Sequence, residues 1–264
     1  MDLDLKGRHA LVTGASRGIG WACARLFLTE GARVTLVARD AGRLAEARER
    51  LLAVCPGAEV AAQAADLRDA AAADQMVSAA EAGLGPVDIL VNSAGAARRT
   101  PPDELTPQAW HDAMDAKYFS YIHVIDPLIK RMAARGQGVI VNIVGMGGKV
   151  ATPVHLPGGS ANAALMLASA GLANAYASRG LRVNVVNPGI TRTERMQEGL
   201  EVEARQTGST PDAVLARTAE RLPLRRVAEA DEIAQAVLFL ASPRASYVNG
   251  AVLAMDGGLN PIVV

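Results

Sequence analysis

A glycine-rich run near the start of the chain has residue types and spacing that suit the binding of a phosphate. It reads Leu11-Val-Thr-Gly-Ala-Ser-Arg-Gly-Ile-Gly20 and lies between a β-branched stretch and an amphipathic stretch of helical period. In such a turn Gly14 permits a sharp reversal, Gly18 lets backbone amides approach a pyrophosphate, and Gly20 allows the helix to pack against the strand. Because strand, turn and helix follow in that order, the run predicts the binding of a dinucleotide.

The elements that must position this turn can be inferred from the hydrophobic pattern. Strands are expected at residues 8–13, 33–38, 58–64, 87–92, 138–144, 182–187 and 251–255. Helices are expected near residues 18–30, 41–53, 69–83, 107–135, 160–179 and 229–241. The strands at 87–92 and 138–144 are almost continuously apolar, which indicates burial on both faces and a parallel sheet covered by helices. The expected fold class is α/β, a single-domain, doubly wound (Rossmann-like) parallel sheet of about seven strands with helices on both faces.

The length of the chain limits its domain organisation. A chain of 264 residues, 50% of them hydrophobic, is long enough for one large core and short for two. We expect one dinucleotide-binding domain over residues 1–264. Residues 193–226 interrupt the alternation with charged residues and two weak helical pieces, so this segment is predicted to form a mobile substrate lid.

The charge and cysteine content argue against several classes of protein. The formal net charge is zero and the basic residues are scattered, so neither a nucleic acid nor a membrane is expected as a partner. The first six residues include two aspartates where a secretory signal would be basic and then apolar, which favours a cytoplasmic protein. Cys23 and Cys55 lack His or Cys neighbours at ligand spacing, so both are expected to be reduced thiols, with no metal site.

Further short motifs follow the other expected strands. They are Asp66-Leu67 after the third strand, Asn92-Ser-Ala-Gly95 after the fourth, Asn187-Pro-Gly189 with Thr193 after the sixth, and Asp256-Gly-Gly258 after the last. Together with the glycine turn, they make the chain resemble the short-chain dehydrogenase/reductase family over essentially its whole length.

The resemblance implies a set of cofactor contacts. Asp66 and Leu67 would contact adenine, Asn92 and Gly95 would line the cofactor cleft, and Ile190 with Thr193 would bind the nicotinamide carboxamide. Taken one by one, Asp66 could instead cap a turn and Asn92 a strand end. The expected cofactor-binding residues are Gly14, Ser16, Arg17, Gly18, Ile19, Gly20, Arg39, Asp66, Leu67, Asn92, Ala94, Gly95, Pro188, Gly189, Ile190 and Thr193.

The end of the second expected strand bears on which cofactor is used. A carboxylate there would bind a free ribose 2′-hydroxyl and repel a 2′-phosphate. This chain has Ala38 followed by Arg39, and Arg17 in the glycine turn can approach from the other side. Guanidinium groups suit phosphate. We therefore predict a preference for NADP(H) over NAD(H).

The expected reaction centre departs from the family. Members carry a serine after the fifth strand, a tyrosine and a lysine four apart on the next helix, and an asparagine on the preceding long helix. Here these positions are Gly145, Gly158, Asn162 and Lys117, and none of the four tyrosines is followed by a lysine four positions on. The chain is thus identified as a divergent member without the usual Asn-Ser-Tyr-Lys residues. Loss of a positioned general acid lowers a rate by about 10²- to 10⁴-fold.

Three residues are candidates for the missing chemistry. His155, in a loop expected to border the nicotinamide, titrates near neutral pH, although it could also be a loop histidine in solvent. Lys117 falls at a normally buried catalytic position, although a lysine on a helix is usually solvated. Asn162 could hold the nicotinamide ribose, or merely lie in the first turn of a helix capped by Ser160. A substrate that needs no strong acid, such as an iminium or a conjugated acceptor, would be a different solution.

Three functions remain open at this point. The first is an NADP(H)-dependent oxidoreductase with an altered proton path, which the retention of Ile190 and Thr193 favours. The second is a catalytically inactive dinucleotide-binding protein, and the third is a lyase or isomerase that uses the cofactor structurally. A small-molecule substrate is expected, and Arg98 with Arg99 hints that it is anionic. The resemblance also implies a homotetramer or homodimer formed through the helices near 107–135 and 160–179.

Overall fold

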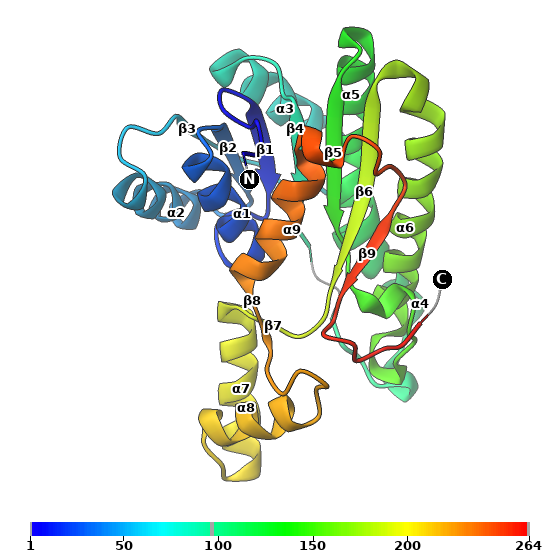
Figure 1. The fold of residues 1–264 in the computed structure, drawn as a ribbon. Helices are drawn as coiled ribbons and strands as arrows, with labels where there is room; N and C mark the ends of the chain where they lie inside the picture. The colour runs from blue at the N-terminus through cyan, green and yellow to red at the C-terminus, as the bar shows by residue number, and fades with distance from the viewer. Residues whose placement is uncertain (1, 96–97, 263–264) are drawn as a thin grey trace.

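A seven-stranded sheet lies at the centre of the molecule (Figure 1). The computed structural model describes residues 2–95 and 98–262, so Met1, Ala96, Ala97, Val263 and Val264 of the expected domain lie outside the described residues. The strands run in the order β3-β2-β1-β4-β5-β6-β9, and every neighbouring pair is parallel. They are β1 (His9–Thr13), β2 (Arg33–Ala38), β3 (Val60–Ala64), β4 (Ile89–Asn92), β5 (Gly138–Ile143), β6 (Leu181–Pro188) and β9 (Val252–Met255). The predicted doubly wound fold is confirmed.

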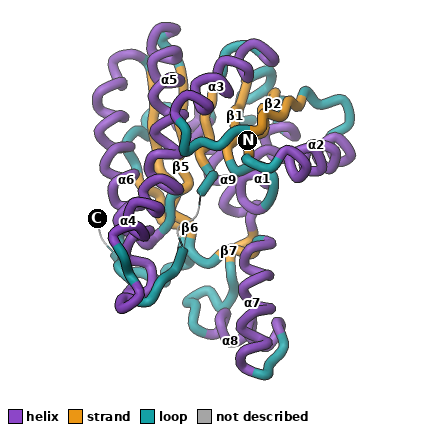
Figure 2. The backbone as a smooth tube through the Cα atoms, turned by 180° about the vertical axis from the view of Figure 1, so that it is seen from behind, coloured by secondary structure: helices purple, strands orange, loops and turns teal. Residues whose placement is uncertain are grey.

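Helices cover both faces of this sheet. The α-helices are α1 (Gly18–Thr29), α2 (Ala41–Val54), α3 (Ala70–Leu84), α4 (Pro107–Ala113), α5 (Ser120–Arg135), α6 (Leu156–Tyr176), α7 (Glu194–Thr207), α8 (Pro211–Glu220) and α9 (Ala230–Ala241). Helices α1, α2 and α9 pack on one face, while α3, α5 and α6 pack on the other, which Figure 2 shows from behind. Shorter helical turns are η1 (Pro102–Glu104), η3 (Met146–Gly148), η4 (Pro153–His155), η5 (Ala177–Arg179) and η6 (Pro243–Ala245).

Each face of the sheet has its own hydrophobic core. Strand β1 is buried along its whole length, with Ala10 and Val12 in one core and Leu11 in the other. This follows from the alternation of side chains along a strand. The continuously apolar strands of the sequence are therefore explained by burial on both sides.

Residues 107–135 are helical throughout, as expected, but the winding of the helix changes in the middle. Thr106 caps α4 by accepting a hydrogen bond from the Ala109 amide, and a π-helical segment, η2 (Met114–Phe119), separates α4 from α5. A π-helix has a wider turn than an α-helix and is frequent at functional sites. The predicted helical span is therefore confirmed, whereas hydrophobic periodicity does not reveal the change to a π-helix within it.

Helix α6 begins earlier than the sequence predicted. It starts at Leu156, not near 160, and Ser160 does not cap it, because the Ser160 hydroxyl donates to the Leu156 carbonyl within the helix. Pro157 suits a first helical turn, where no backbone N–H is needed. A side chain at Gly159 would lie 2.7 Å from the Gly147 carbonyl oxygen, so close packing explains a glycine there. The Pro-Gly-Gly run is thus the start of a helix and not a loop.

The segment predicted as a lid forms two helices beyond the sheet. Helices α7 and α8 pack through Leu200, Ala204 and Val214, a core cluster separate from the two that flank the sheet. A short parallel pair, β7 (Thr191–Arg192) and β8 (Ala228–Glu229), lies where the segment leaves and rejoins the main body (Figure 1). The two weak helical pieces of the sequence are therefore real helices, and their mobility stays a prediction.

Membrane and metal-binding features bear on the expected partners. No helix in the described part of the chain combines the length and apolar character needed to cross a membrane. Within residues 2–95 and 98–262, no three His, Cys, Asp or Glu side chains gather in a way that could hold a metal ion. Cys23 is buried in α1, Cys55 is half-buried, and both thiols are free.

Candidate active site

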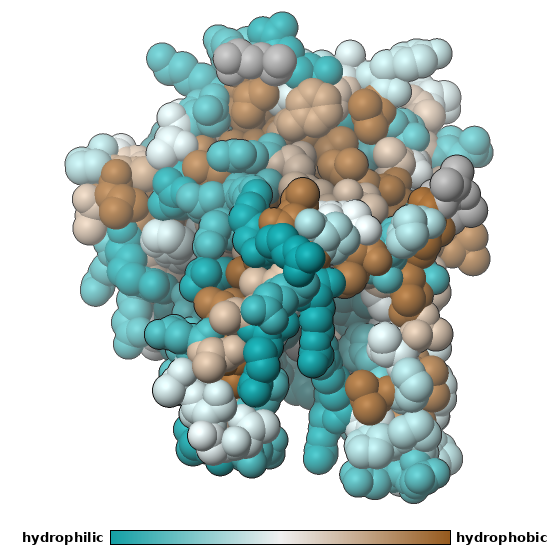
Figure 3. Space-filling view, turned by 60° about the horizontal axis from the view of Figure 1, so that its bottom comes forward, coloured by the Kyte–Doolittle hydropathy of each residue, from teal (hydrophilic) through white to brown (hydrophobic). Residues whose placement is uncertain are grey.

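A cavity of about 820 Å³ opens at the carboxyl ends of β1 to β4. In a doubly wound sheet ligands bind at this end, where the strand order reverses, which here is between β1 and β4. Hydrophilic side chains are prominent on this side of the molecule (Figure 3). The expected cofactor-binding residues on its wall are Gly14, Ser16, Arg17, Gly18, Ile19, Arg39, Asp66, Leu67, Ala94, Gly95 and Thr193.

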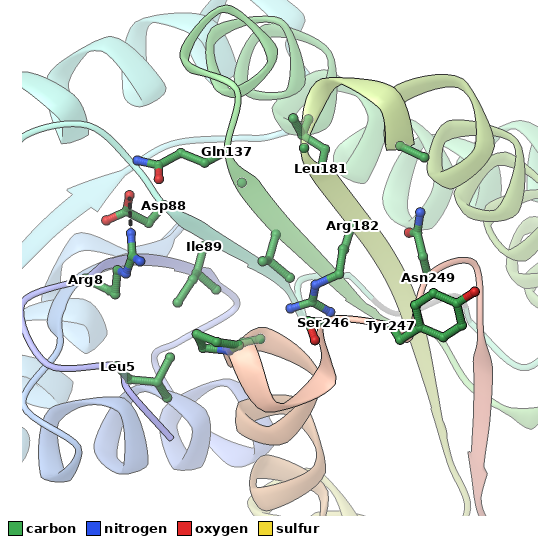
Figure 4. A pocket seen from close by; sticks show the side chains of 16 residues that line it. Leu5, Arg8, Asp88, Ile89, Gln137, Leu181, Arg182, Ser246, Tyr247 and Asn249 are labelled. Atoms are coloured by element: carbon green, nitrogen blue, oxygen red, sulfur yellow. Dashed lines mark ion pairs between the residues drawn. The ribbon is translucent and has the colours of Figure 1, made fainter. Parts of the chain in front are cut away.

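A second cavity, of about 600 Å³, lies at the opposite end of the sheet (Figure 4). Its charged side chains are already bonded within the protein. The Arg182 guanidinium donates to the carbonyl oxygens of Leu240, Ser242 and Val248, and Arg8 pairs with Asp88. None of the site residues expected from the sequence lines this cavity. The carboxyl-end cavity is therefore the candidate site.

The glycine turn has the geometry that close approach of a phosphate requires. Gly14 has φ +66°, and a side chain there would lie 2.7 Å from the Ser93 carbonyl oxygen. A side chain at Gly20 would collide with the Gly14 carbonyl oxygen, which explains the close packing of α1 on the turn. No side chain of the described residues caps the start of α1 at Arg17. The amides there are thus available to an anion.

Arg17 connects the glycine turn to the lid. Its guanidinium donates to the Glu198 carboxylate of α7 over 2.6 Å. Both side chains are partly open to solvent, and exposed ion pairs of this kind contribute about 0.2 to 1 kcal/mol. An anion that entered the cavity could therefore displace the Glu198 carboxylate from Arg17 with little loss of free energy.

The cavity wall at the end of β2 contains a basic residue, Arg39. Ala38, Arg39, Asp40 and Arg43 all line the cavity, and the Asp40 carboxylate accepts a hydrogen bond from the Arg43 amide and so caps α2. Across the cavity, Asp66 pairs with Arg68, and this hydrogen-bonded guanidinium lowers the pKa of the Asp66 carboxyl to about 2. Asp66 also accepts from the Arg68 amide, so it caps a turn as well as lining the cavity.

Asn92 lies beneath the cavity and not on its wall. Its side chain is fully buried, accepts from the Thr13 hydroxyl and donates to Asn142, which in turn donates to Ser169 of α6. The Thr13 hydroxyl also accepts from the amides of Ser93 and Ala94. This buried network fixes the turn after β4, whose residues do line the cavity. The sequence did not indicate Asn142 or Ser169.

Three further expected residues also lie outside the cavity wall. Pro188 ends β6, Gly189 packs against Asp256, and Ile190 is 40% exposed. They precede Thr193, whose hydroxyl accepts from the Met196 amide and caps α7. Their place is between the sheet and the lid, so any contact with the nicotinamide stays a prediction.

The residues after β5 leave an unusually open backbone. Gly145 has φ +133° and donates its amide to the Asn187 side chain. The buried Asn162 amide lies 3.5 Å from where side chains at Gly145 and Gly147 would begin. Gly158 lies in the first turn of α6. Neither Gly145 nor Gly158 brings a side chain to this place.

Lys117 brings an amine to the same strand end from η2. It is 7% exposed, and its Nζ donates to the Tyr121 hydroxyl at 3.0 Å and to the Ile143 carbonyl at 3.1 Å. Burial, followed by the positive charge of Arg195, lowers the pKa of Lys117 to about 7. The solvated alternative for this lysine is therefore wrong. A buried amine that titrates near neutral pH can give or take a proton there.

Tyr121 is a member of this group that the sequence did not single out. Its hydroxyl donates to the Ile143 carbonyl at 2.8 Å, and Lys117 Nζ lies 4.7 Å from the centre of its ring. A signal was present, since Lys117 precedes Tyr121 by four residues on an expected helix and side chains at that spacing are neighbours. It was missed because the expected order was tyrosine first.

His155 lies beside Gly147 in the segment that follows β5. Its ring is 3.0 Å from where a side chain at Gly147 would begin, and its Nδ1 is buried without a hydrogen-bond partner among the described residues. Burial, followed by the charges of Arg99 and Lys117, lowers the pKa of His155. The half-buried ring is not the solvent-facing loop histidine of the alternative. Lys117, Asn162 and His155 thus lie around one segment, next to the cavity and not on its wall.

Comparison with known proteins gives matches along nearly the whole chain. The family model described as enoyl-(acyl carrier protein) reductase matches residues 14–260. Among curated proteins, galactitol 2-dehydrogenase (L-tagatose-forming) of Cereibacter sphaeroides is 38% identical over 257 residues, which are 96% of this chain and 95% of that one.

Two solved structures share the fold and contain a nucleotide. L-sorbose reductase from Gluconobacter frateurii, complexed with NADPH and L-sorbose, has a TM-score of 0.95 at 31% identity, with both chains fully covered. An NADPH-bound short chain oxidoreductase of Pseudomonas aeruginosa PAO1 has a TM-score of 0.88 at 33% identity, covering 97% of this chain and 98% of that one. The latter is described as containing an atypical catalytic center.

Proposed function

The chain belongs to the short-chain dehydrogenase/reductase family, and we propose that it is an NADP(H)-dependent oxidoreductase that reduces or oxidises a small molecule by hydride transfer. The observation that carries the proposal is a single cavity whose wall contains the glycine turn, Arg39 and Thr193. These residues would meet the pyrophosphate, the adenosine ribose and the nicotinamide. The wall therefore suits a whole dinucleotide and not only its adenosine half.

The residues on the wall fit such a cofactor. Gly14 and Gly18 keep the turn free of side chains, and the uncapped start of α1 offers amides to the pyrophosphate. Leu67 and Asp66 would lie beside the adenine. When bound, the nicotinamide supplies or accepts the hydride.

A preference for NADP(H) is supported by the charges at the end of β2. Arg39 faces the cavity, and the neighbouring carboxylate of Asp40 is engaged in capping α2. A 2′-phosphate would therefore meet a guanidinium group there. The NADPH complexes among the related structures agree with this choice.

We assign the proton transfer to Lys117. In the family a tyrosine and a lysine on the helix after the fifth strand do this work, and an asparagine lies on the long helix before it. By that comparison Gly158 replaces the tyrosine, while Lys117 and Asn162 exchange the lysine and asparagine positions. An amine therefore still reaches the end of β5, but from the opposite helix.

Reduction would then proceed with the following proton balance. The carbonyl carbon of the substrate gains a hydride, and the Lys117 ammonium donates a proton to the carbonyl oxygen, so that an alcohol forms. Lys117 is left neutral and regains its proton from water. In the oxidation direction, the neutral amine accepts the hydroxyl proton. A pKa of about 7 allows both directions near neutral pH.

His155 and Asn162 complete the proposed centre. Because the lowered pKa of His155 makes its ring neutral at pH 7, it would hydrogen-bond the substrate oxygen and not serve as the main acid. Asn162 would orient the nicotinamide ribose through its amide.

The test is NADPH consumption over a panel of ketones, imines, quinones and enones. Lys117→Met should lower turnover of the accepted class by about 10²- to 10⁴-fold, and His155→Ala by less, with NADPH affinity kept. Lys130→Met is the matched control, because Lys130 is an exposed lysine that pairs with Asp126 on α5.

Two outcomes would contradict the proposal. Equal turnover by the Lys117 and Lys130 variants would remove Lys117 from the chemistry. Tight binding of NADPH without turnover of any substrate class would instead indicate a dinucleotide-binding protein.

A further inference from the structure

Tyr121 is the group that contacts the Lys117 amine most extensively. It is fully buried, its hydroxyl accepts from Lys117 Nζ at 3.0 Å, and the face of its ring lies 4.7 Å from the same nitrogen. The hydroxyl proton is directed to the Ile143 carbonyl at 2.8 Å. The hydroxyl therefore turns a lone pair, and not its proton, towards the amine.

Few other groups stabilise the charged form of the Lys117 amine. Its second acceptor is the Ile143 carbonyl, which the Tyr121 hydroxyl shares. The charged or titratable groups that act on it from neighbouring elements are Arg195 of α7 and His155 of η4. Arg195 disfavours an ammonium, and so does His155 whenever it is protonated. The π-face and the hydroxyl of Tyr121 are thus the main side-chain groups that stabilise the charged form.

We propose that Tyr121 is a positioning residue for the reaction, which holds the Lys117 amine at the end of β5 and keeps it able to carry a proton. This inference rests on the proposed function, in which Lys117 exchanges that proton with substrate. Tyr121 itself does not exchange it, because burial raises the pKa of its hydroxyl well above the working range. Its role is to keep enough of the amine charged at neutral pH.

The direct test is an NMR titration of lysine in protein labelled with ¹³C-lysine. The chain has only four lysines, and Lys117→Met identifies the Lys117 signal. In Tyr121→Phe the ring stays and the acceptor is lost, so the Lys117 midpoint should fall by about one to two pH units. Tyr118→Phe is the matched control, because Tyr118 lies on η2 and its ring contacts Phe119. It should leave the midpoint unchanged.

Activity provides a second measurement that a purely structural role would not reproduce. At pH 7 the Tyr121→Phe enzyme should reduce substrate about fivefold more slowly or worse, since less of the amine is charged. The lost rate should return as the pH is lowered through the new midpoint. Arg195→Gln should move the midpoint in the opposite direction, upward.

If Tyr121→Phe does not fold, a more conservative replacement can be measured in its place. Replacing the tyrosines with 3-fluorotyrosine keeps the ring and hydroxyl but weakens the oxygen as an acceptor, so the midpoint should fall by a smaller amount. A Lys117 midpoint that is unchanged or raised in both proteins would overturn the inference. A lowered midpoint without any change in the pH profile of reduction would instead contradict the proposed role of Lys117, and the two failures are therefore distinguishable.

Discussion

Lys117 has a buried amine that bonds to no carboxylate among the described residues. Its hydrogen bonds go to a hydroxyl and a carbonyl, which stabilise a charge less than an ion pair would. Water is largely excluded, so the charged form is penalised and the pKa falls to about 7. Burying an amine in this way destabilises the fold. Such a cost is expected where the amine takes part in a reaction.

The cost of this burial predicts a pH-dependent stability. Below pH 7 the lysine is charged in both states, and its desolvation lowers the free energy of unfolding by an amount on the order of 5 kcal/mol. Between pH 7 and the unfolded pKa of 10.5, the unfolded state binds more protons, so stability rises with pH. Lys117→Met should therefore stabilise the protein most at pH 6 and progressively less towards pH 10. Urea unfolding of both proteins at these pH values measures the difference, and a constant difference would show that Lys117 is not desolvated.

Arg39 gives the clearest prediction about the cofactor. Arg39→Ala should raise the Kd for NADPH roughly 10- to 100-fold, because a charged hydrogen bond to the 2′-phosphate is lost. The Kd for NADH should change little. Titration calorimetry with both nucleotides measures this, with Arg217→Ala on the distant helix α8 as the control. Tighter binding of NADH than of NADPH by the unmodified protein would refute the preference.

The sequence predicted which helices and strands exist well, but it predicted their local geometry poorly. All seven strands of the main sheet occur within two residues of the expected positions. The central strands are buried on both faces, which gives them a nearly continuous apolar pattern. The π-helix that carries Lys117 and the early start of α6 were not predicted. Both depend on packing, since Gly159 fits against Gly147 only in the folded chain. These two misses lie beside the candidate reaction centre, where local rules are most often broken.

Glycines in helices differ in whether the space around them would accept a side chain. Gly20→Ala should destabilise the protein by several kcal/mol and abolish NADPH binding, because the new side chain would collide with the Gly14 carbonyl oxygen. Gly199→Ala, in α7 where no described atom lies within 4 Å of the new Cβ, should instead stabilise by about 0.5 to 1 kcal/mol. Thermal unfolding compares the two variants. A harmless Gly20→Ala would contradict the described contact between α1 and the turn.

At the scale of the molecule, topology followed from the order of elements. Alternating strands and helices with right-handed connections leave few arrangements of a parallel sheet, so the doubly wound fold was predictable. The position of the site was predictable for the same reason, because ligands bind where the strand order reverses. Which residues form the wall of the cavity was harder to predict. Asn92, for example, was expected on the wall and lies beneath it, in a network with Asn142 and Ser169 that only the three-dimensional packing brings together.

The assembly of the chain is predicted to be a homodimer or homotetramer. Helix α6 carries Leu167 with 77% of its surface exposed, a large apolar side chain that a partner would cover. Light scattering should give a mass two or four times 27.5 kDa. Leu167→Glu should lower that mass, whereas Leu224→Glu, an exposed leucine outside the expected interface, should not. A monomer at working concentration would count against the assembly.

The most direct test of the proposed chemistry is the pH dependence of kcat/KM for NADPH-driven reduction, measured for the unmodified protein and for Lys117→Met. In the proposed mechanism the Lys117 ammonium is the reactive form, so the rate should be level below pH 7 and fall about tenfold per pH unit above it. In Lys117→Met the rate should be low and this limb should vanish. A limb that persists unchanged in Lys117→Met, or that falls at the lower pH expected of His155, would contradict the assignment of the proton to Lys117.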